Sequence, residues 1–235
     1  MTKTPLAAVI LAGGRSSRMG HDKALIAIGA ETLLQRTCRI ALACADAVYI
    51  VTPWPDRYRA QVPEGVEFVP EPPTPGQAGA FQGPTIALIA ALETLSARSA
   101  ATPDWVLTLA CDMPNLSATV LATWREQLAA LAPHHLAYLP QRQQRWEPLC
   151  GFYRTAALDS LKRYANTGGR WSETGPRGPS LQGWLKQQAV PGRILVSSQS
   201  SDASRIVPIP QVDGALLTNV NTPEELAEWQ QARAF

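Results

Sequence analysis

The sequence has no long apolar run, little net charge and few cysteines, and each shortage excludes a class of protein. None of its apolar stretches reaches the length of a membrane span. The apolar stretch near the amino terminus is too short for a signal peptide, and no small-residue cleavage pattern follows it. The net charge is +2 and 17% of the residues are charged, so neither a nucleic acid nor a membrane surface is an expected partner.

Cysteines and histidines give no sign of a disulfide framework, a metal cluster or a nucleophile–base pair. The four cysteines have no CxxC spacing, which fits a reduced compartment and a cytoplasmic protein. The three histidines, His21, His134 and His135, form no Ser/His/Asp pattern and no set with metal-ligand spacing. The chain of 235 residues is 46% hydrophobic, which is sufficient for a sizeable core.

The stretch Ala7–Lys23, AAVILAGGRSSRMGHDK, has the composition of a polyphosphate-binding loop. Its apolar run is long enough for a strand buried on both faces of a parallel sheet. Gly13 and Gly14 end the run, and because glycine has no Cβ, their backbone N–H groups can come close to a ligand. The cations that follow are Arg15, Arg18 and Lys23. A surface turn with solvated cations is the alternative, and the buried run before the glycines favours the ligand loop over it.

This loop matches neither of the two common nucleotide fingerprints. A P-loop has the pattern GxxxxGK[ST], whereas Lys23 here follows Asp22 and precedes Ala24. A dinucleotide-binding turn has the pattern GxGxxG, whereas the two glycines here are adjacent. The loop therefore excludes a P-loop ATPase and a nicotinamide-dependent dehydrogenase.

Strand and helix patterns alternate through the first half of the chain and are more mixed in the second half. We predict strands at Ala7–Leu11, Ala47–Thr52, Val66–Val69, Asp104–Ala110, His135–Leu139 and Ile206–Ile209, a hairpin turn at Gln141–Trp146 that leads into Pro148–Tyr153, and helices at Glu31–Ala45, Pro84–Ala97, Ser117–Leu131, Thr155–Tyr164, Ser180–Gln188 and Thr222–Ala232. This order predicts an α/β fold with a mostly parallel central sheet and helices on both faces. Ligands of such sheets bind beyond the carboxyl ends of the strands, where we expect the Gly13–Lys23 loop, Thr52 and Asp112.

Asp112 follows the predicted strand Asp104–Ala110 and precedes Pro114. One role for such an aspartate is to cap the next helix, although Ser117 suits that position better. The other role is that of a Mg²⁺ ligand, because Mg²⁺ takes one or two carboxylates together with phosphate oxygens. The neighbouring phosphate loop favours the metal ligand over the cap.

The segment Asn219–Leu226, NVNTPEEL, has the pattern of a helix start. Thr222 is the expected N-cap, Pro223 takes the first helical position and two acids follow in the first turn. Asn219 and Asn221 point to the same side of an extended segment. Since Asn221 precedes the N-cap, the helix does not require its side chain.

Three motifs together resemble one enzyme family. The motifs are LAGG-R-SS-RMG-x-DK, then Cys111–Pro114 (CDMP), then NVNTPEEL. They follow one another in the order found in nucleotidyltransferases that join a nucleoside monophosphate to a small phosphorylated acceptor. Among these, the chain is most similar to the molybdenum cofactor guanylyltransferases. The resemblance implies a Rossmann-like fold of the nucleotide-diphospho-sugar transferase type and transfer of GMP from GTP to the terminal phosphate of molybdopterin. It also implies Mg²⁺ as cofactor, with a molybdoenzyme or a molybdopterin-handling chaperone as further partners.

The same resemblance implies roles for individual residues. The residues implied in catalysis are Arg18, Lys23 and Asp112, with Asp112 on the metal. The residues implied in nucleotide binding are Leu11, Ala12, Gly13, Gly14, Arg15, Lys23, Thr52, Glu71, Gly83, Pro84 and Asp112. The residues implied in acceptor binding are Glu147, Pro148, Asn219 and Asn221, and an ordinary hairpin edge is the alternative role of Glu147 and Pro148. Two positions depart from the family pattern, since Ala87 stands where glycine is common and either Pro72 or Glu71 falls where aspartate is frequent.

The motifs lie at both ends of the chain, so we expect one domain over residues 1–235. Its nucleotide-binding half would cover about 1–115 and its acceptor-binding half about 116–235. A molybdopterin cytidylyltransferase that uses CTP is one alternative. Another is an isoprenoid cytidylyltransferase, which typically has Pro-Lys where this chain has Asp22-Lys23. A non-catalytic chaperone for pterin or nucleotide is the third, and Asp112 argues against it because binding alone needs no metal-holding carboxylate.

Overall fold

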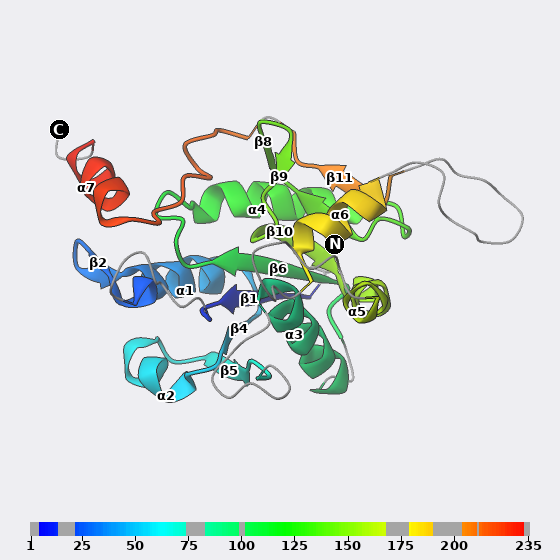
Figure 1. The fold of residues 1–235 in the computed structure, drawn as a ribbon, viewed down its shortest axis with the longest axis horizontal. Helices are drawn as coiled ribbons and strands as arrows, with labels where there is room; N and C mark the ends of the chain where they lie inside the picture. The colour runs from blue at the N-terminus through cyan, green and yellow to red at the C-terminus, as the bar shows by residue number, and fades with distance from the viewer. Residues whose placement is uncertain are drawn as a thin grey trace, which may run out of the picture.

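A seven-stranded sheet runs through the middle of the protein, and helices pack on both of its faces (Figure 1). The computed structural model describes residues 5–13, 22–73, 83–98, 102–167, 179–189, 204–210 and 212–232. The strands lie in the order β11-β7-β10-β6-β1-β4-β5. Their bounds are β1 Leu6–Leu11, β4 Ala47–Thr52, β5 Val66–Pro70, β6 Trp105–Ala110, β7 Ala137–Leu139, β10 Cys150–Arg154 and β11 Ile206–Pro208.

Six of these seven strands run in the same direction. β1, β4, β5 and β6 pair in parallel with one another, and β11 is parallel to β7. β10 runs antiparallel to both of its neighbours, β6 and β7, so the direction of β7 agrees with that of β6. The prediction of a mostly parallel central sheet is confirmed, and the strands from the second half of the chain extend the sheet of the first half.

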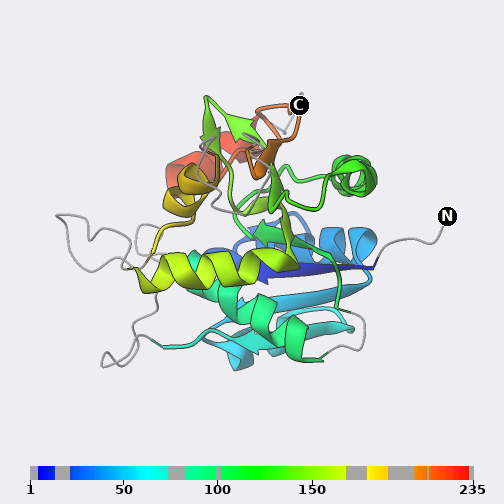
Figure 2. The same ribbon diagram turned by 90° about the vertical axis from the view of Figure 1, so that its right-hand side faces the viewer.

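The side chains of β1 show why its apolar run is a central strand. Successive side chains of a strand point to opposite faces, so Ala8 and Ile10 enter one core while Ala7 and Val9 enter the other. Helices α1 and α4 cover the first core, and α3, α5 and α6 cover the second (Figure 2). The helices are α1 Leu33–Cys44, α2 Pro55–Tyr58, α3 Pro84–Arg98, α4 Ala118–Glu126, α5 Leu158–Asn166, α6 Leu181–Ala189 and α7 Pro223–Gln231.

Short elements change several predicted boundaries. They are the 3-10 helices η1 Lys23–Leu25, η2 Arg59–Gln61, η3 Gln127–Ala130 and η4 Thr155–Ala157, and the hairpins β2 Ala27–Ile28 with β3 Glu31–Thr32 and β8 Gln141–Arg142 with β9 Arg145–Trp146. The helix predicted at Glu31–Ala45 begins at Leu33 because Thr32 ends β3 and caps α1. The helix predicted at Ser117–Leu131 divides into α4 and η3. Ser117 takes the predicted N-cap position of α4, although its side chain makes no capping hydrogen bond.

The predicted start of the last helix is confirmed. Thr222 accepts a hydrogen bond from the Glu225 N–H, and Pro223 takes the first helical position. Across the described ranges, no helix combines the length and the apolar character that crossing a membrane requires.

Candidate active site

A cavity of about 370 Å³ opens at the carboxyl ends of β1 and β6, beside the start of α3. This is the edge of the sheet at which the sequence predicts a ligand site. Its lining includes eight of the residues predicted to bind the nucleotide, namely Leu11, Ala12, Gly13, Lys23, Glu71, Gly83, Pro84 and Asp112. Residues from four separate stretches of the chain therefore meet around one space.

Lys23 joins the first motif of the sequence to the last. It is the first residue of η1, and its Nζ atom donates a hydrogen bond of 2.7 Å to the Asn221 Oδ1 atom. The same Nζ atom lies 3.6 Å from the Asp112 Oδ2 atom. One ammonium group thus contacts a carboxylate at the end of β6 and an amide just before α7.

Asp112 lies directly beyond β6 and is largely buried. Its carbonyl oxygen accepts a hydrogen bond of 2.9 Å from the Val220 N–H, which fixes the Asn219–Asn221 segment beside it. Burial raises the pKa of the Asp112 carboxyl, and the charge of Lys23 opposes that rise. The buried Asn219 Oδ1 atom has no hydrogen-bond partner within the described residues. Carboxylate and amide oxygens are hard donors, which suits this corner of the cavity to a divalent cation.

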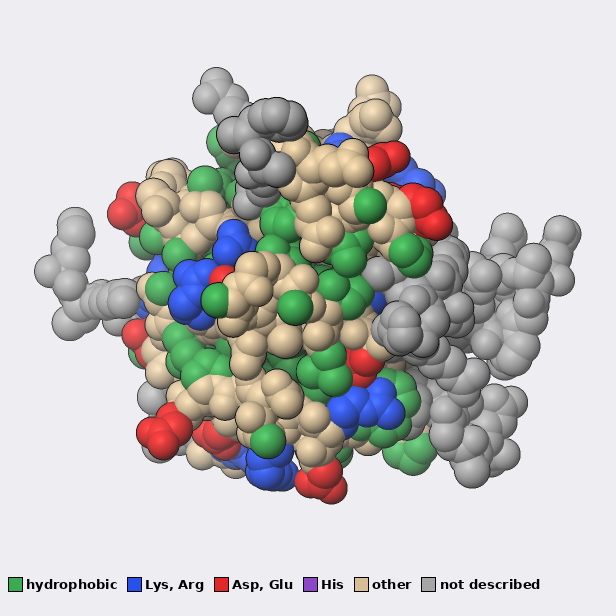
Figure 3. All heavy atoms as spheres, turned by 90° about the vertical axis from the view of Figure 1, so that its left-hand side faces the viewer, with side chains coloured by type: hydrophobic (Ala, Val, Ile, Leu, Met, Phe, Trp, Pro, Cys, Tyr) green, Lys and Arg blue, Asp and Glu red, His purple; other side chains and the backbone are tan. Residues whose placement is uncertain are grey.

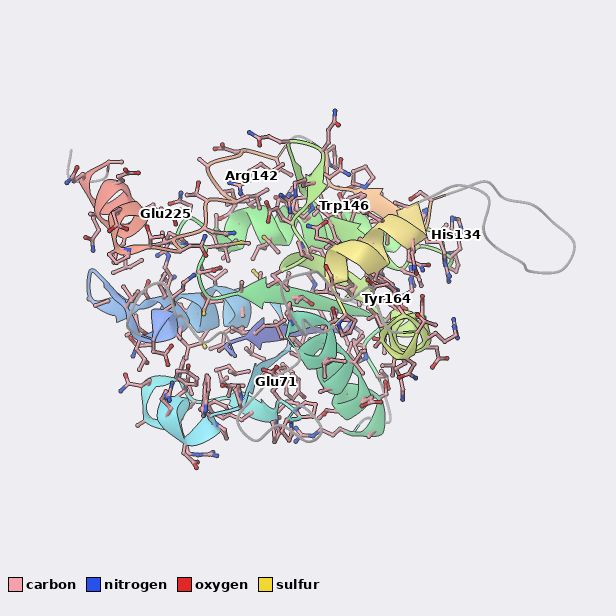
Figure 4. All side chains as sticks on the ribbon, viewed as in Figure 1. Glu71, His134, Arg142, Trp146, Tyr164 and Glu225 are labelled. Atoms are coloured by element: carbon pink, nitrogen blue, oxygen red, sulfur yellow. The ribbon has the colours of Figure 1, made fainter. Side chains whose placement is uncertain are left out.

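Glu71 brings a second carboxyl group to the cavity, between the end of β5 and the start of α3 (Figure 4). Its side chain is 6% exposed. Burial raises the pKa of this carboxyl to about 7, although it accepts a hydrogen bond from the Gly83 N–H. Gly13 lies so close that a Cβ at this position would overlap the Glu71 carboxylate. The absence of a side chain at Gly13 is therefore what allows the loop and Glu71 to share this wall.

Thr52 is the predicted nucleotide-binding residue that is described but does not line the cavity. It is fully buried. Its hydroxyl donates a hydrogen bond of 2.9 Å to the Ala12 carbonyl and accepts one of 3.2 Å from the Trp54 N–H. Thr52 thus supports the cavity wall from behind.

The predicted acceptor residues Glu147 and Pro148 follow the β8–β9 hairpin. Glu147 forms an ion pair with Arg142 at 3.3 Å, and burial raises its pKa while the charge of Arg142 lowers it. The Pro148 carbonyl accepts a hydrogen bond of 2.8 Å from the Tyr153 hydroxyl. The next residue, Leu149, lines the cavity, which puts this segment beside the nucleotide-side residues.

Several predicted residues lie outside the described ranges. They are Gly14, Arg15 and Arg18, and His21, for which no site role was predicted, lies outside them too. The other two histidines, His134 and His135, are neighbours whose ring centroids are 4.2 Å apart. They lie just before the amino end of β7. His134 is on the right in Figure 4, whereas β1 and β6 end at the cavity on the left.

Tyr58 belongs to the site although no sequence pattern predicts it. This tyrosine ends α2, a helix too short for any apolar periodicity, and it lines the cavity. Its hydroxyl donates a hydrogen bond of 2.7 Å to the Asp22 Oδ2 atom, and Arg57 donates another of 3.0 Å. The other Asp22 oxygen accepts from the Ala24 N–H at 3.1 Å and caps η1. Asp22 therefore orients the backbone at the start of η1.

Charges around this edge are mixed in sign. Figure 3 shows the face toward which β1 and β6 point, and basic and acidic side chains are scattered over it in small groups. Within the described residues, no three histidine, cysteine or acidic side chains gather as a metal cluster. A metal at this edge would therefore rely on few protein ligands and on oxygens of its substrate, as Mg²⁺ commonly does.

Comparison with known proteins matches this chain to one family. Residues 8–177 match the family model described as a MobA-like NTP transferase domain. A probable molybdenum cofactor guanylyltransferase of Nostoc sp. is 41% identical over 222 residues, which cover 94% of this chain and 89% of the relative. A protein of the same name from Synechococcus elongatus is 38% identical over 224 residues, which cover 95% of this chain and 96% of the relative.

Solved structures share the fold. The crystal structure of molybdopterin-guanine dinucleotide biosynthesis protein A from Archaeoglobus fulgidus superposes with a TM-score of 0.67. The match covers 96% of this chain and 97% of that one, at 18% sequence identity. The agreement extends over both halves of the chain, and it confirms the expected nucleotidyltransferase fold.

Proposed function

This chain belongs to the family of MobA-like NTP transferases, and we propose that it transfers GMP from GTP to the terminal phosphate of molybdopterin. Its relatives of 41% and 38% identity, named probable molybdenum cofactor guanylyltransferase, support this proposal. It is a nucleotidyltransferase, and the products would be molybdopterin guanine dinucleotide and pyrophosphate. The observation that carries the proposal is the meeting of Gly13, Lys23 and Asp112 around one cavity. The four cysteines are buried thiols, which supports a cytoplasmic location.

The chemical problem in such a reaction is the repulsion between two anions. A phosphate monoester has its second pKa near about 6, so the acceptor phosphate is already an anionic nucleophile at neutral pH and needs no general base. The described lining of the cavity contains no histidine, which suits a reaction of this kind. Positioning of the reactants and neutralisation of their charge are then the tasks of the protein.

Lys23 and the glycine loop are suited to these tasks. The Lys23 ammonium would meet the β- and γ-phosphates and the departing pyrophosphate, since it reaches the cavity from η1. The backbone of Gly13 would approach the phosphates closely because no Cβ intervenes. Arg18, which the described ranges do not include, keeps its predicted role as a second cation.

Asp112 is the proposed ligand of Mg²⁺, and the residues present fit such an ion. Its carboxylate lines the cavity. The buried Asn219 Oδ1, which has no hydrogen-bond partner among the described residues, belongs to the segment that the Val220–Asp112 hydrogen bond holds beside it. Both groups are hard oxygen donors of the kind that Mg²⁺ takes together with phosphate oxygens. A bound Mg²⁺ would supply charge neutralisation at the phosphates.

The acceptor would enter from the side of Glu147, Pro148, Asn219 and Asn221. Asn221 supports this assignment because its side-chain oxygen already holds the Lys23 ammonium. An acceptor bound at Asn221 would therefore lie next to the group that meets the triphosphate. Glu71, Gly83 and Pro84, which line the cavity, would face the base of the nucleotide.

A nucleotide panel tests the proposal. The protein is incubated with molybdopterin, Mg²⁺ and either GTP, CTP or ATP, and pyrophosphate release is followed. We expect release with GTP to exceed release with the other two nucleotides by at least about tenfold, which corresponds to about 1.4 kcal/mol of discrimination. Preference for CTP would identify a cytidylyltransferase instead, and nucleotide binding without Mg²⁺ and without turnover would identify a chaperone.

A further inference from the structure

The two described ends of the phosphate loop are held by one short segment, Val51–Tyr58. At the first end, the Ala12 N–H donates a hydrogen bond of 2.9 Å to the Val51 carbonyl, and the Ala12 carbonyl accepts one of 2.9 Å from the Thr52 hydroxyl. At the second end, the Asp22 Oδ2 atom accepts hydrogen bonds from Tyr58 and Arg57, at 2.7 and 3.0 Å. We call this segment the bracket.

We propose that Tyr58, assisted by Arg57, is a positioning residue that sets the place of the Lys23 ammonium by anchoring Asp22. The proposal rests on the nucleotidyl transfer proposed above, in which Lys23 meets the triphosphate. Tyr58 acts through Asp22 and not through the reacting atoms.

The burial of Tyr58 makes it a rigid anchor. The residue is 1% exposed, and burial raises the pKa of its hydroxyl, with the Asp22 hydrogen bond as a further cause. The hydroxyl therefore remains a neutral donor across the physiological pH range. Because a partly buried carboxylate that loses a donor is left less well satisfied, the Tyr58–Asp22 contact favours one position of Asp22.

The bracket is also connected internally. The Arg57 guanidinium stacks on the Trp54 ring with its central carbon 4.5 Å from the ring centroid. The Trp54 N–H in turn donates to the Thr52 hydroxyl at 3.2 Å. The groups that hold Asp22 are thus tied to the group that holds Ala12, so the bracket fixes the separation between the two ends of the loop.

Anchoring of Asp22 determines where Lys23 can reach, because the two residues share a peptide bond. The Asp22 side chain turns toward α2 and caps η1, whereas the Lys23 side chain turns toward Asp112 and Asn221. A rotation of the backbone at Asp22 would carry the start of η1 with it. The Lys23 ammonium would then leave the position from which it contacts both partners.

The experiment compares Tyr58→Phe with a matched control, Tyr138→Phe. Tyr138 is a buried tyrosine of β7 that does not line the cavity. Arg57→Gln is a second test variant, and because the Arg57 side chain is half-exposed, misfolding is less of a concern. Lys23→Ala defines the largest loss of tripolyphosphate binding and of kcat/KM against which the other variants are compared. Binding of inorganic tripolyphosphate is measured by calorimetry well below each melting temperature, and kcat and KM for GTP are measured in parallel.

We expect Tyr58→Phe to weaken tripolyphosphate binding and to lower kcat/KM for GTP on the order of tenfold, with a smaller loss in Arg57→Gln and none in Tyr138→Phe. Arg57→Lys should recover part of the loss in Arg57→Gln, because it restores the positive charge that pairs with the Asp22 carboxylate. Wild-type affinity and kcat/KM in both Tyr58→Phe and Arg57→Gln would overturn the proposal, even if the melting temperature fell. An equal loss in Tyr138→Phe would overturn it too.

Tripolyphosphate separates this inference from the proposed function, because it carries neither a base nor an acceptor. If the wild type does not turn over GTP but Tyr58→Phe still weakens tripolyphosphate binding, the anchoring of Lys23 stands and the proposed reaction fails. If GTP is turned over and Tyr58→Phe binds and reacts as the wild type does, the reaction stands and the anchoring fails.

Discussion

Replacement of Gly13 by alanine tests how closely the phosphate loop and Glu71 are packed. A Cβ at Gly13 would overlap the Glu71 carboxylate and would lie 3.3 Å from the Pro53 Cδ atom. Non-bonded carbon atoms are comfortable at about 3.5–4.0 Å, so the Glu71 side chain must withdraw by about 1 Å or more. That movement weakens the hydrogen bond from the Gly83 N–H to the Glu71 carboxyl.

The magnitude follows from these two effects. Overpacking of a well-packed site costs about 1–3 kcal/mol, and a typical net hydrogen bond contributes about 1 kcal/mol. The clashing atom is the end of a side chain that can move, so we expect the lower part of the combined range. Gly13→Ala should reduce the free energy of unfolding by about 2 kcal/mol and should raise KM for GTP at least about tenfold, because the new methyl group stands between the backbone and the phosphates.

Urea unfolding of a double-mutant cycle provides the assay. Glu71→Ala removes the clashing atoms, so the Gly13→Ala/Glu71→Ala protein should be more stable than the sum of the single changes by about 1 kcal/mol or more. Gly214→Ala is the matched control, because a Cβ there meets no atom within 4 Å. It should change stability by less than about 0.5 kcal/mol. Additive losses in the cycle would refute the close packing of Gly13 against Glu71.

The remaining predictions concern charge. Burial raises the pKa of Glu71 from 4.5 to about 7, so the folded state disfavours the ionised carboxylate. The free energy of unfolding should therefore fall as the pH rises from about 4.5 through about 7. Glu71→Gln should remove up to about 3 kcal/mol of that fall, measured by urea unfolding at pH about 5 and about 8. Lys23→Ala and Asp112→Asn should each lower kcat on the order of 10²–10³-fold in pyrophosphate-release assays while the circular dichroism spectrum is kept, and near-normal rates would contradict their roles. Chelation of divalent cations should abolish turnover of the wild type, and retained turnover would remove the metal from the proposal. Asn221→Ala should lower kcat/KM for GTP about tenfold, because the Lys23 ammonium loses its hydrogen-bond partner, and unchanged kinetics would show that this contact is dispensable.

Strong local patterns made much of the fold predictable. The both-face burial of β1 follows from its uninterrupted apolar run, and the start of α7 follows from Thr222 and Pro223. The location of Asp112 beyond β6 follows from the rule that ligand-binding residues of parallel sheets gather at carboxyl ends. In each case a few neighbouring residues suffice to specify the backbone.

Contacts between distant residues could not be predicted in this way. Nothing local marks Tyr58 as the partner of Asp22, because their hydrogen bond joins two segments 36 positions apart. Thr52 was expected at the ligand, yet its hydroxyl is consumed by Ala12 and Trp54. The division of the helix predicted at Ser117–Leu131 also has no strong local signal, since Gln127–Ala130 contains no proline or glycine.

The hydrogen bond between Lys23 and Asn221 spans 198 positions of the chain. All seven strands of the main sheet precede Asn219, so a nascent chain could assemble the sheet and most of the cavity before this partner emerges from the ribosome. Such an immature protein would have a place for a nucleotide but would lack the amide that steadies its lysine. Competence for chemistry would therefore arrive only with the residues that also begin α7.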